Sequence, residues 1–250
     1  MKRLPLWVVV FWLALWQVMS MVVGYDILLP SPLLTLQKLW VLLQQSVFYL
    51  SIASTLGHIT LGFISAICVS VVLAVASHRW LWFCQLVTPV ILVAKSVPVA
   101  SFIILILIWF SSSTLSVTIA FIMVLPIVYT NVLTAIGQLD PDLEEMASMF
   151  ALTTYAKVRY VRLPQIMPYF RSATLVGLGL SFKAGIAAEI IGLPKNSIGE
   201  QLYSAKLYID TPNVFAWTVA IVVVSYWYET LFAKGLDALC AQLESARWTL

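Results

Sequence analysis

Long apolar stretches alternate with short polar ones along this chain, and the apolar stretches have the length of a bilayer crossing. A helix needs about 20 apolar residues to span the hydrocarbon core. Because lipid cannot hydrogen-bond to the backbone, such segments are predicted as helices and not strands. The pattern therefore predicts an all-α membrane protein with six transmembrane helices in a single domain, residues 1–250. The predicted helices cover roughly 5–23, 48–76, 83–110, 114–137, 168–191 and 213–233.

The composition agrees with a membrane protein. Of the 250 residues, 62% are hydrophobic and 10% are charged, whereas a soluble domain carries about 25% charged residues. The net charge of +3 is small and gives no reason to expect a nucleic-acid partner. His58 and His78 are isolated in the sequence, and the cysteines form no CxxC pair. We therefore expect no metal site and no catalytic residue in this chain.

Basic residues are distributed unevenly between the two ends of the predicted helices. With the N-terminus placed in the cytoplasm, one side receives nine of them and the other side three. Cytoplasmic loops carry the excess of lysine and arginine, so both termini are predicted to be cytoplasmic. No small-residue cleavage site follows the first apolar segment, and we expect it to be retained as a membrane helix. The nine are Lys2, Arg3, Arg79, Lys157, Arg159, Arg162, Arg171, Lys234 and Arg247, and the three are Lys38, Lys195 and Lys206.

Three segments depart from the simple helical pattern. The third apolar segment contains Lys95 and Pro98, and proline inside a helix predicts a kink or a local unwinding. The outer segment 24–47 begins with "GYDILLPSP", whose prolines rule out a continuous helix, and continues as an amphipathic stretch, which predicts a helix lying at the interface. The outer segment 192–212 contains a short run that can form a helix.

The largest polar interruption, residues 138–166, lies on the predicted cytoplasmic side. Asp140 and Pro141 match the start of a helix, a capping acid followed by proline at the first helical position. Leu163 precedes Pro164, and because a residue before proline avoids the helical region, the segment is predicted to end there. The expected structure is a short, capped helical hairpin parallel to the membrane. An ordinary charged loop that satisfies the positive-inside rule is the alternative.

This interruption resembles the cytoplasmic signature of ABC importer membrane subunits, which reads Glu-Ala-Ala, three residues, Gly, nine residues, Ile-x-Leu-Pro. The spacing is complete in "EMASMFALTTYAKVRYVRLP". Met146 replaces the second residue of the signature, and Ala151 replaces its glycine. Since glycine permits a sharp turn, a continuous or differently bent helix is an alternative at Ala151. The residues identical to the signature are Glu145, Ala147, Leu163 and Pro164, with Val161 a near match.

The resemblance extends from Leu29 onward and indicates a type I ABC importer permease fold. It is similar to the branch that serves nitrate, alkanesulfonates, taurine and thiamine-pyrimidine precursors. The matching stretches are "LPSP", "STLGHITLGFISAICVSVVLAVASHR", "PVILVAKSVPVASFIILILIWF" and "AAEIIGLPKNSIGEQLYSAKLYIDT".

The resemblance implies a permease subunit in the bacterial cytoplasmic membrane, with an ABC ATPase subunit, an extracytoplasmic solute-binding protein and a second permease copy as partners. The chain contains no GxxxxGK[ST] motif, so no cofactor is expected in it. ATP and Mg would be bound by the partner ATPase. The loop would couple to that ATPase through Glu145, Ala147, Met149, Phe150, Ala151, Leu152, Tyr155, Leu163 and Pro164.

Charged residues at membrane depth are costly and mark candidate translocation sites. We expect Lys95, Ser96, Pro98, Lys183 and Glu189 to line the path and to favour a small anionic or polar solute, such as a sulfonate or nitrate. The alternatives are a Lys183–Glu189 pair, and a Lys95 that satisfies carbonyl groups freed near Pro98.

Other functions remain as alternatives to this prediction. A thiamine-pyrimidine or other heterocycle-precursor importer would use the same fold. The coupling subunit of a vitamin importer is expected to carry Ala-Arg-Gly-type motifs, which are not present in this sequence. A membrane-embedded transferase requires clustered acids or histidines at a membrane face, and the acidic cluster 140–145 coincides with the coupling signature.

Overall fold

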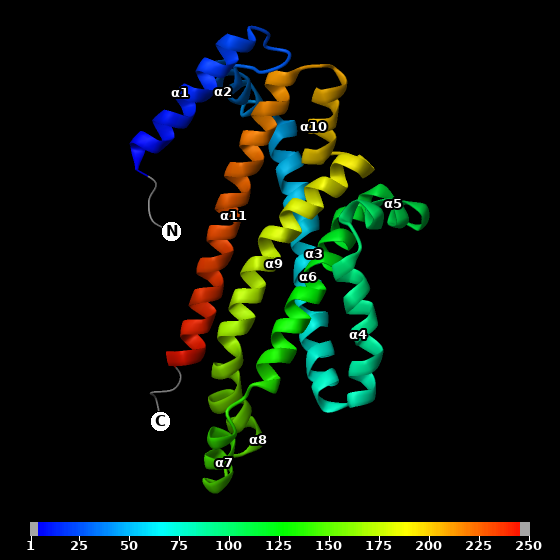
Figure 1. The fold of residues 1–250 in the computed structure, drawn as a ribbon, viewed down its shortest axis with the longest axis vertical. Helices are drawn as coiled ribbons and strands as arrows, with labels where there is room; N and C mark the ends of the chain where they lie inside the picture. Colours follow the sequence, from blue (N-terminus) through cyan, green and yellow to red (C-terminus); the bar gives the residue numbers. More distant parts are fainter. Residues whose placement is uncertain (1–4, 246–250) are drawn as a thin grey trace.

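The computed structural model describes residues 5–245, so Lys2, Arg3 and Arg247 of the charge count lie outside it. The described residues form helices and no strands (Figure 1). The helices are α1 (Leu6–Val23), α2 (Pro32–Leu42), α3 (Ser46–Arg79), α4 (Leu81–Ser96), α5 (Val99–Trp109), α6 (Ser112–Gly137), α7 (Pro141–Met149), α8 (Thr154–Ala156), the π-helix η1 (Lys157–Arg162), α9 (Leu163–Gly192), α10 (Ile198–Leu207) and α11 (Thr211–Ser245).

The predicted all-α membrane fold is confirmed. Among the described residues, five helical segments are long and apolar enough to cross a membrane. The predicted third span is broken into α4 and α5, which meet at an angle of 109° across Val97 and Pro98. Val97 is extended, with φ −79° and ψ 130°, as expected before a proline. Counting this bent pair as one span gives six.

Helices α3, α6 and α9 form the central bundle. Phe63, Val124 and Leu178 come from these three helices and are fully buried together. Gly62 of α3 faces the backbone of Val117 in α6, and a Cβ atom at Gly62 would collide with that carbonyl group. This glycine therefore allows the close approach of α3 and α6, the pair with the most extensive contact in the described chain.

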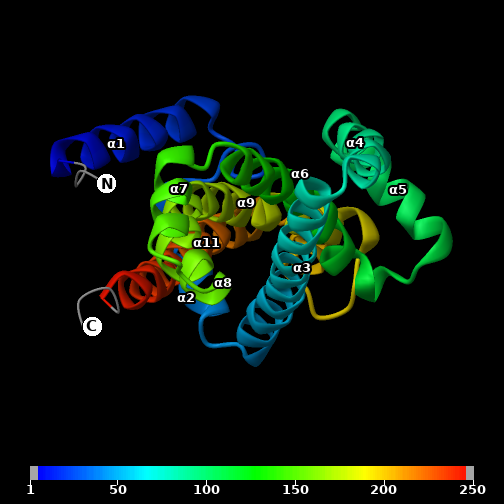
Figure 2. The ribbon, with the colours of Figure 1, turned by 90° about the horizontal axis from the view of Figure 1, so that it is seen from below.

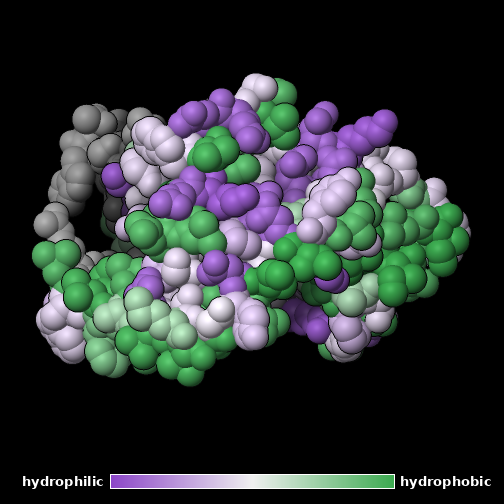
Figure 3. Space-filling model, turned by 90° about the horizontal axis from the view of Figure 1, so that it is seen from above, coloured by the Kyte–Doolittle hydropathy of each residue, from purple (hydrophilic) through white to green (hydrophobic). Residues whose placement is uncertain are grey.

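Successive spanning segments run in alternating directions along the long axis (Figure 1). Helices α7 and α8 lie at the lower end, whereas α2 and α10 lie at the upper end. On that upper end, hydrophilic residues gather across the middle and hydrophobic residues flank them (Figure 3). Helix α1 runs toward the upper end, and α11 runs from the upper end toward the lower one (Figure 1).

Two parts of the chain extend away from the central bundle. Helix α1 lies on one side of it, and the bent pair α4–α5 lies on the opposite side (Figure 2). Both carry exposed large apolar side chains, among them Trp12, Leu92 and Ile108. Exposed apolar surface on this scale is what a lipid-facing or subunit-facing helix presents. With the long apolar helices, it identifies a multi-pass membrane protein.

Candidate coupling loop and translocation site

The polar interruption begins with the predicted capped helix. Asp140 is the N-cap of α7, and its carboxylate accepts a hydrogen bond of 2.9 Å from the backbone nitrogen of Asp142. Pro141 occupies the first helical position, where its missing N–H group leaves no hydrogen bond unmade. Two acidic residues, Asp142 and Glu144, lie in the first turn, where the helix dipole stabilises negative charge. The helix start predicted from the sequence is therefore confirmed.

The sharp turn after α7 is present although an alanine stands in the place of the signature glycine. Ala151 has φ 48°, in the left-handed region. The backbone nitrogen of Leu152 donates to the carbonyl oxygen of Ala147 at 3.1 Å, and that of Ala151 donates to Ser148 at 3.0 Å. These two bonds form a Schellman motif, which satisfies carbonyl groups at the helix end. The structure therefore excludes the alternative of a continuous helix through Ala151.

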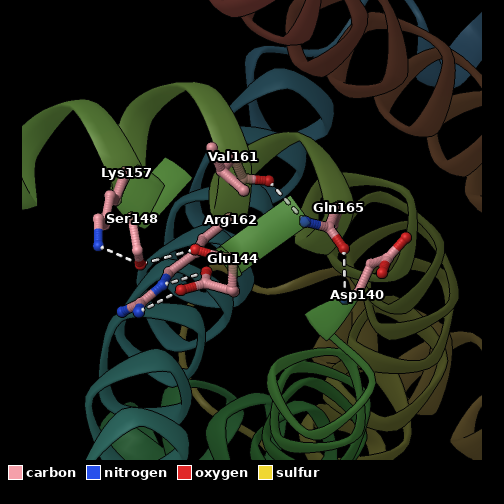
Figure 4. Close-up of polar contacts among 7 residues, drawn as sticks. All are labelled: Asp140, Glu144, Ser148, Lys157, Val161, Arg162 and Gln165. Carbon is pink, nitrogen blue, oxygen red and sulfur yellow. Dashed lines mark hydrogen bonds and ion pairs between the residues drawn. The ribbon is translucent and has the colours of Figure 1, made fainter. Parts of the chain in front are cut away.

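A network of polar contacts fixes α7 to the helix that follows (Figure 4). Arg162 Nε and Nη2 donate to the two carboxylate oxygens of Glu144 at 2.7 and 2.8 Å. Lys157 Nζ donates to Ser148 Oγ at 2.9 Å, near the other end of α7. A two-bond arginine–carboxylate pair fixes both distance and orientation, so the loop has a defined shape. The Arg162 guanidinium also holds the pKa of the Glu144 carboxyl below its ordinary value.

Gln165 adds a contact at the beginning of the loop. Its Oε1 atom accepts a hydrogen bond of 2.8 Å from the backbone nitrogen of Asp140, and its Nε2 atom donates to the carbonyl oxygen of Val161 at 2.9 Å (Figure 4). Tyr169 donates its hydroxyl to Gln138 Oε1 at 2.9 Å. These contacts connect the segment before α7 with the segment after η1, and they close the loop at its base.

The prediction that the loop ends at Leu163-Pro164 is wrong. Helical structure is continuous from Thr154 to Gly192, and Leu163 itself is helical, with φ −57° and ψ −43°. The reason is the π-helix η1, in which the Leu163 nitrogen donates to the Val158 carbonyl oxygen, five residues back. Pro164 has no N–H group to donate, and it lies where the backbone hydrogen bonds change from the π-helical to the α-helical pattern. The helix therefore continues through this proline. The predicted helical hairpin is therefore a short helix beside a long continuous one.

The turn presents large apolar side chains to the surroundings. Met149, Phe150 and Tyr155 are 81%, 75% and 75% exposed, and Leu152 is also exposed. Glu145 is exposed beside them, whereas Ala147 is fully buried and Leu163 and Pro164 are half-buried. The structure thus divides the predicted coupling residues into an exposed apolar group at the tip and a packed group beneath it.

Lys95, Ser96 and Pro98 lie together at the break between α4 and α5. They line an open pocket of about 400 Å³, whose other wall includes Pro126 of α6 and Leu180 of α9. Lys95 Nζ donates to Thr130 Oγ1 at 3.3 Å. The alternative was that Lys95 donates to carbonyl groups near Pro98. Within the described residues its hydrogen bond goes to Thr130 instead.

Lys183 is exposed on α9 and lines a second open pocket, of about 470 Å³, between α9 and α11. The opposite wall carries Ser225, Tyr226 and Glu229. Ser225 Oγ donates to Glu229 Oε1 at 3.3 Å. The pocket therefore combines one cationic and one anionic side chain between two helices that are long and apolar enough to cross a membrane.

Glu189 lies elsewhere, inside the packing of the chain. It is fully buried, and its carboxylate accepts hydrogen bonds from Thr55 Oγ1 at 2.8 Å, Ser116 Oγ at 3.2 Å and the Gly199 nitrogen at 3.3 Å. These donors belong to α3, α6 and α10. The structure thus separates Glu189 from the two lysines and shows it joining four helices, without the pairing to Lys183 that was the alternative.

The sequence-based choice missed two acidic residues that the structure makes prominent. Glu144 pairs with Arg162, whereas the neighbouring Glu145, which matches the signature, faces outward. Glu229 shares a pocket with Lys183. A signal for Glu229 was available, since it lies inside the last apolar segment, where an ionisable residue marks a candidate functional site.

The chain belongs to the family of binding-protein-dependent transport system inner membrane components, whose model matches residues 59–242. The resemblance to type I ABC importer permeases of the nitrate and taurine branch is thereby confirmed. Members of this family are components of transport systems, and the chain is accordingly a transport permease.

Two curated relatives give the same picture. The nitrate import permease protein NrtB of Synechococcus elongatus is 24% identical over 190 residues, which cover 72% of this chain and 68% of the relative. The taurine transport system permease protein TauC of Escherichia coli is 21% identical over 234 residues, which cover 91% of this chain and 83% of the relative.

Proposed function

We propose that this chain is the membrane-spanning subunit of an ATP-driven importer and that it couples to a separate ATPase through residues 140–164. The observation that carries the proposal is the exposed apolar group Met149, Phe150 and Tyr155 at the tip of a loop that Glu144 and Arg162 hold in shape. Exposed aromatic side chains on a rigid support are typical anchors of protein interfaces. ATP and Mg belong to the partner in this proposal.

The tip of the loop would face the bacterial cytoplasm. Lys157, Arg159 and Arg162 lie on this end of the chain, together with Arg79 and Arg171, and cytoplasmic loops carry the excess of basic residues. Because the spanning segments alternate in direction, both termini would lie on this side as well. The opposite end, formed by α2 and α10, would meet an extracytoplasmic solute-binding protein.

Two copies of the chain would enclose the solute path. Lys95 and Lys183 are exposed in segments that are long and apolar enough to cross a membrane, and a charge in contact with lipid costs roughly 2.5–3.5 kcal/mol or more. A face that carries both lysines is stable in a membrane when it borders water or another subunit. We infer that this face, with Ser96 and Pro98 beside Lys95, lines a path shared with a second copy of the chain.

The solute in this proposal is small and anionic or polar. The lysines supply positive charge for an anionic group, and the two relatives are named as nitrate and taurine permeases. The buried Glu189 is left out of the path because its contacts are all internal. Its role is to hold α3, α6, α9 and α10 together.

The coupling proposal is tested by co-purification of the tagged permease with its ATPase from the native host. We compare Phe150→Asp and Tyr155→Asp with Tyr208→Asp as the matched control, because Tyr208 is 80% exposed at the opposite end of the molecule. An aspartate at either position would replace an apolar contact with a charge, which weakens binding to the ATPase. We expect the first two variants to retain less than a tenth of the ATPase, and the control to retain all of it.

Two results would contradict the proposal. The first is full recovery of the ATPase with both tip variants, which would place the interface elsewhere. The second is the absence of any ATP-hydrolysing partner from the wild-type preparation under conditions that preserve a known importer. Membrane insertion of each variant is checked first by its yield in the membrane fraction.

A further inference from the structure

The pocket between α9 and α11 carries two opposite charges that do not pair. Lys183 and Glu229 line it from opposite walls. In the described part of the chain, no nitrogen–oxygen distance of 4.0 Å or less joins either side chain to an opposite charge. Opposite charges at membrane depth gain from direct contact, because each one is costly to keep unpaired there. Their separation therefore calls for an explanation.

The backbone of α9 brings the two charges to neighbouring levels of the pocket. A Cβ atom at Gly179 would lie 3.2 Å from Glu229 Oε1, so the carboxylate rests against the glycine. Lys183 is one helical turn further along α9, which corresponds to a rise of about 6 Å. Because Gly179 has no side chain, the Glu229 carboxylate reaches the surface of α9 just below the lysine. The two charges thus lie about one helical turn apart along the pocket.

The carboxylate of Glu229 is only partly engaged by the protein. Ser225 donates to its Oε1 atom, and within residues 5–245 no hydrogen bond reaches its Oε2 atom. Tyr226, which is 57% exposed, adds a hydroxyl group to the same wall. The floor of the pocket is apolar, with Phe182, Ile186 and Ile221. A small molecule with a short apolar centre and two charged ends matches this lining.

We propose that this pocket binds a small zwitterion, with its ammonium group at Glu229 and its anionic group at Lys183. The inference rests on the proposed function, since it names the solute class for the same path. A simple anion fits less well, because the Glu229 carboxylate, which lines the same pocket, would repel it. A zwitterion neutralises both side chains at once, with one charge-assisted hydrogen bond at each end. Amino acids and aminosulfonates belong to this class.

The test measures binding to the permease–ATPase complex in detergent, without the solute-binding protein, so that receptor selectivity does not enter. Three probes of similar size are compared by saturation-transfer NMR titration: 2-aminoethanesulfonate, ethanesulfonate and ethylammonium. They carry both charges, the negative charge alone and the positive charge alone. Because only the first probe can form a charge-assisted hydrogen bond at both ends, we expect it to bind about tenfold more tightly, or better, than either of the others.

Two variants test which charged end of the probe binds to which side chain. Glu229→Gln is expected to weaken 2-aminoethanesulfonate binding about tenfold and to leave ethanesulfonate binding unchanged or improved. Lys183→Gln is expected to weaken both sulfonates by a similar factor and to spare ethylammonium. Asp26→Asn, which removes an exposed carboxylate from the turn after α1, is the control and leaves all three unchanged.

Several results would overturn the inference. One is equal affinity of the wild type for 2-aminoethanesulfonate and ethanesulfonate, or no binding of any probe. Another is a Glu229→Gln variant that changes both sulfonates equally, as expected if Glu229 served only to pair with a lysine of the second copy. Co-purification with the ATPase is unaffected by these outcomes, so a failure here is distinguishable from a failure of the importer proposal.

Discussion

Ala151 bears a backbone conformation that glycine adopts at lower cost. A left-handed residue with a Cβ atom costs roughly 1–2 kcal/mol relative to the right-handed conformation, and glycine avoids this penalty. We therefore predict that Ala151→Gly raises the free energy of unfolding by about 0.5–1 kcal/mol, somewhat less than the full penalty because glycine also gains freedom in the unfolded chain. Reversible unfolding in mixed detergent micelles measures the change.

Ile209 offers a matched comparison at the other end of the molecule. It has φ 57°, and the nitrogens of Ile209 and Asp210 donate to the carbonyl oxygens of Lys206 and Ala205, which is the same motif at the end of α10. Its side chain is 64% exposed, so Ile209→Gly removes little packing, and a gain at least as large is expected. A loss of stability in both variants would mean that neither turn has the left-handed geometry described above.

The pair between Glu144 and Arg162 gives a pH dependence with a definite sign. Because the folded pKa of Glu144 is lowered from its ordinary 4.5, the pair stabilises the loop above that value, and the contribution is lost as pH falls through the folded pKa. The pair is partly exposed, so we expect about 0.5–1 kcal/mol.

The measurement is the difference in thermal stability between wild type and Glu144→Gln, from pH 7 down to the lowest pH at which both remain soluble. The wild type is expected to be the more stable near neutral pH, and the difference should shrink below about pH 4.5. Glu145→Gln is the control, since Glu145 is exposed beside it. A difference that is constant with pH would show that the charge of Glu144 does not contribute.

At the scale of elements, the helix from Thr154 to Gly192 shows what the sequence did not reveal. The rule for residues before proline placed a boundary at Leu163, and the apolar pattern began the fifth membrane helix only at about residue 168. The π-helix adds one residue to a turn, so the side chains before Lys157 and after Leu163 fall out of helical phase with each other. A pattern of constant period has no means to detect this. By contrast, the break at Pro98 was predicted, because proline within an apolar segment is a local signal.

Glu189 connects four helices. Two substitutions separate the contribution of its negative charge to stability from the contribution of its size and hydrogen bonds. Glu189→Gln keeps an oxygen for Thr55 and Gly199, and Ser116 can turn its hydroxyl to accept from the new amide group. We expect a change within about 1 kcal/mol. Glu189→Ala leaves buried donors without acceptors and opens a cavity, at a cost of about 3 kcal/mol.

Unfolding of both Glu189 variants, together with ATP-dependent uptake, provides the measurement. A Glu189→Gln variant that is stable and active fits a purely internal role. A stable variant that has lost uptake would return Glu189 to the translocation path, where the sequence placed it. Equal stability of the alanine variant and the wild type would contradict the hydrogen-bonded arrangement.

At the scale of the whole molecule, the fold makes a prediction about sidedness. Single cysteines at Tyr155 and Tyr208, in a chain whose own cysteines are replaced by serine, place reactive groups at opposite ends. We expect a membrane-impermeant maleimide added to intact cells to label the Tyr208→Cys variant at least tenfold faster than Tyr155→Cys, because in the proposed orientation only the α10 end faces outward. Inverted vesicles should reverse the order, and labelling from one side only for both variants would contradict the alternating topology.

The sequence was informative about the molecule as a whole and less so about its polar sites. Apolar length predicted the spans, and the coupling signature predicted the family. The role of Glu189 was not predictable, because two of its three hydrogen bonds come from Thr55 and Ser116, in helices distant in the chain. Glu229 became a candidate only when the packing of α11 against α9 placed it beside Gly179 and in the pocket of Lys183.

The continuous helix from Thr154 to Gly192 has a mechanical consequence. Its 39 residues join the loop to the α10 end through unbroken helical backbone, and α9 packs extensively against α6 on the way. The segment also contains two features that bend helices, the π-helix η1 and Pro168. A push on the loop would therefore be carried along one continuous backbone toward the α10 end. Any change of direction along this path is expected near η1 and Pro168, close to the loop, so the part of α9 beyond them would move as one piece.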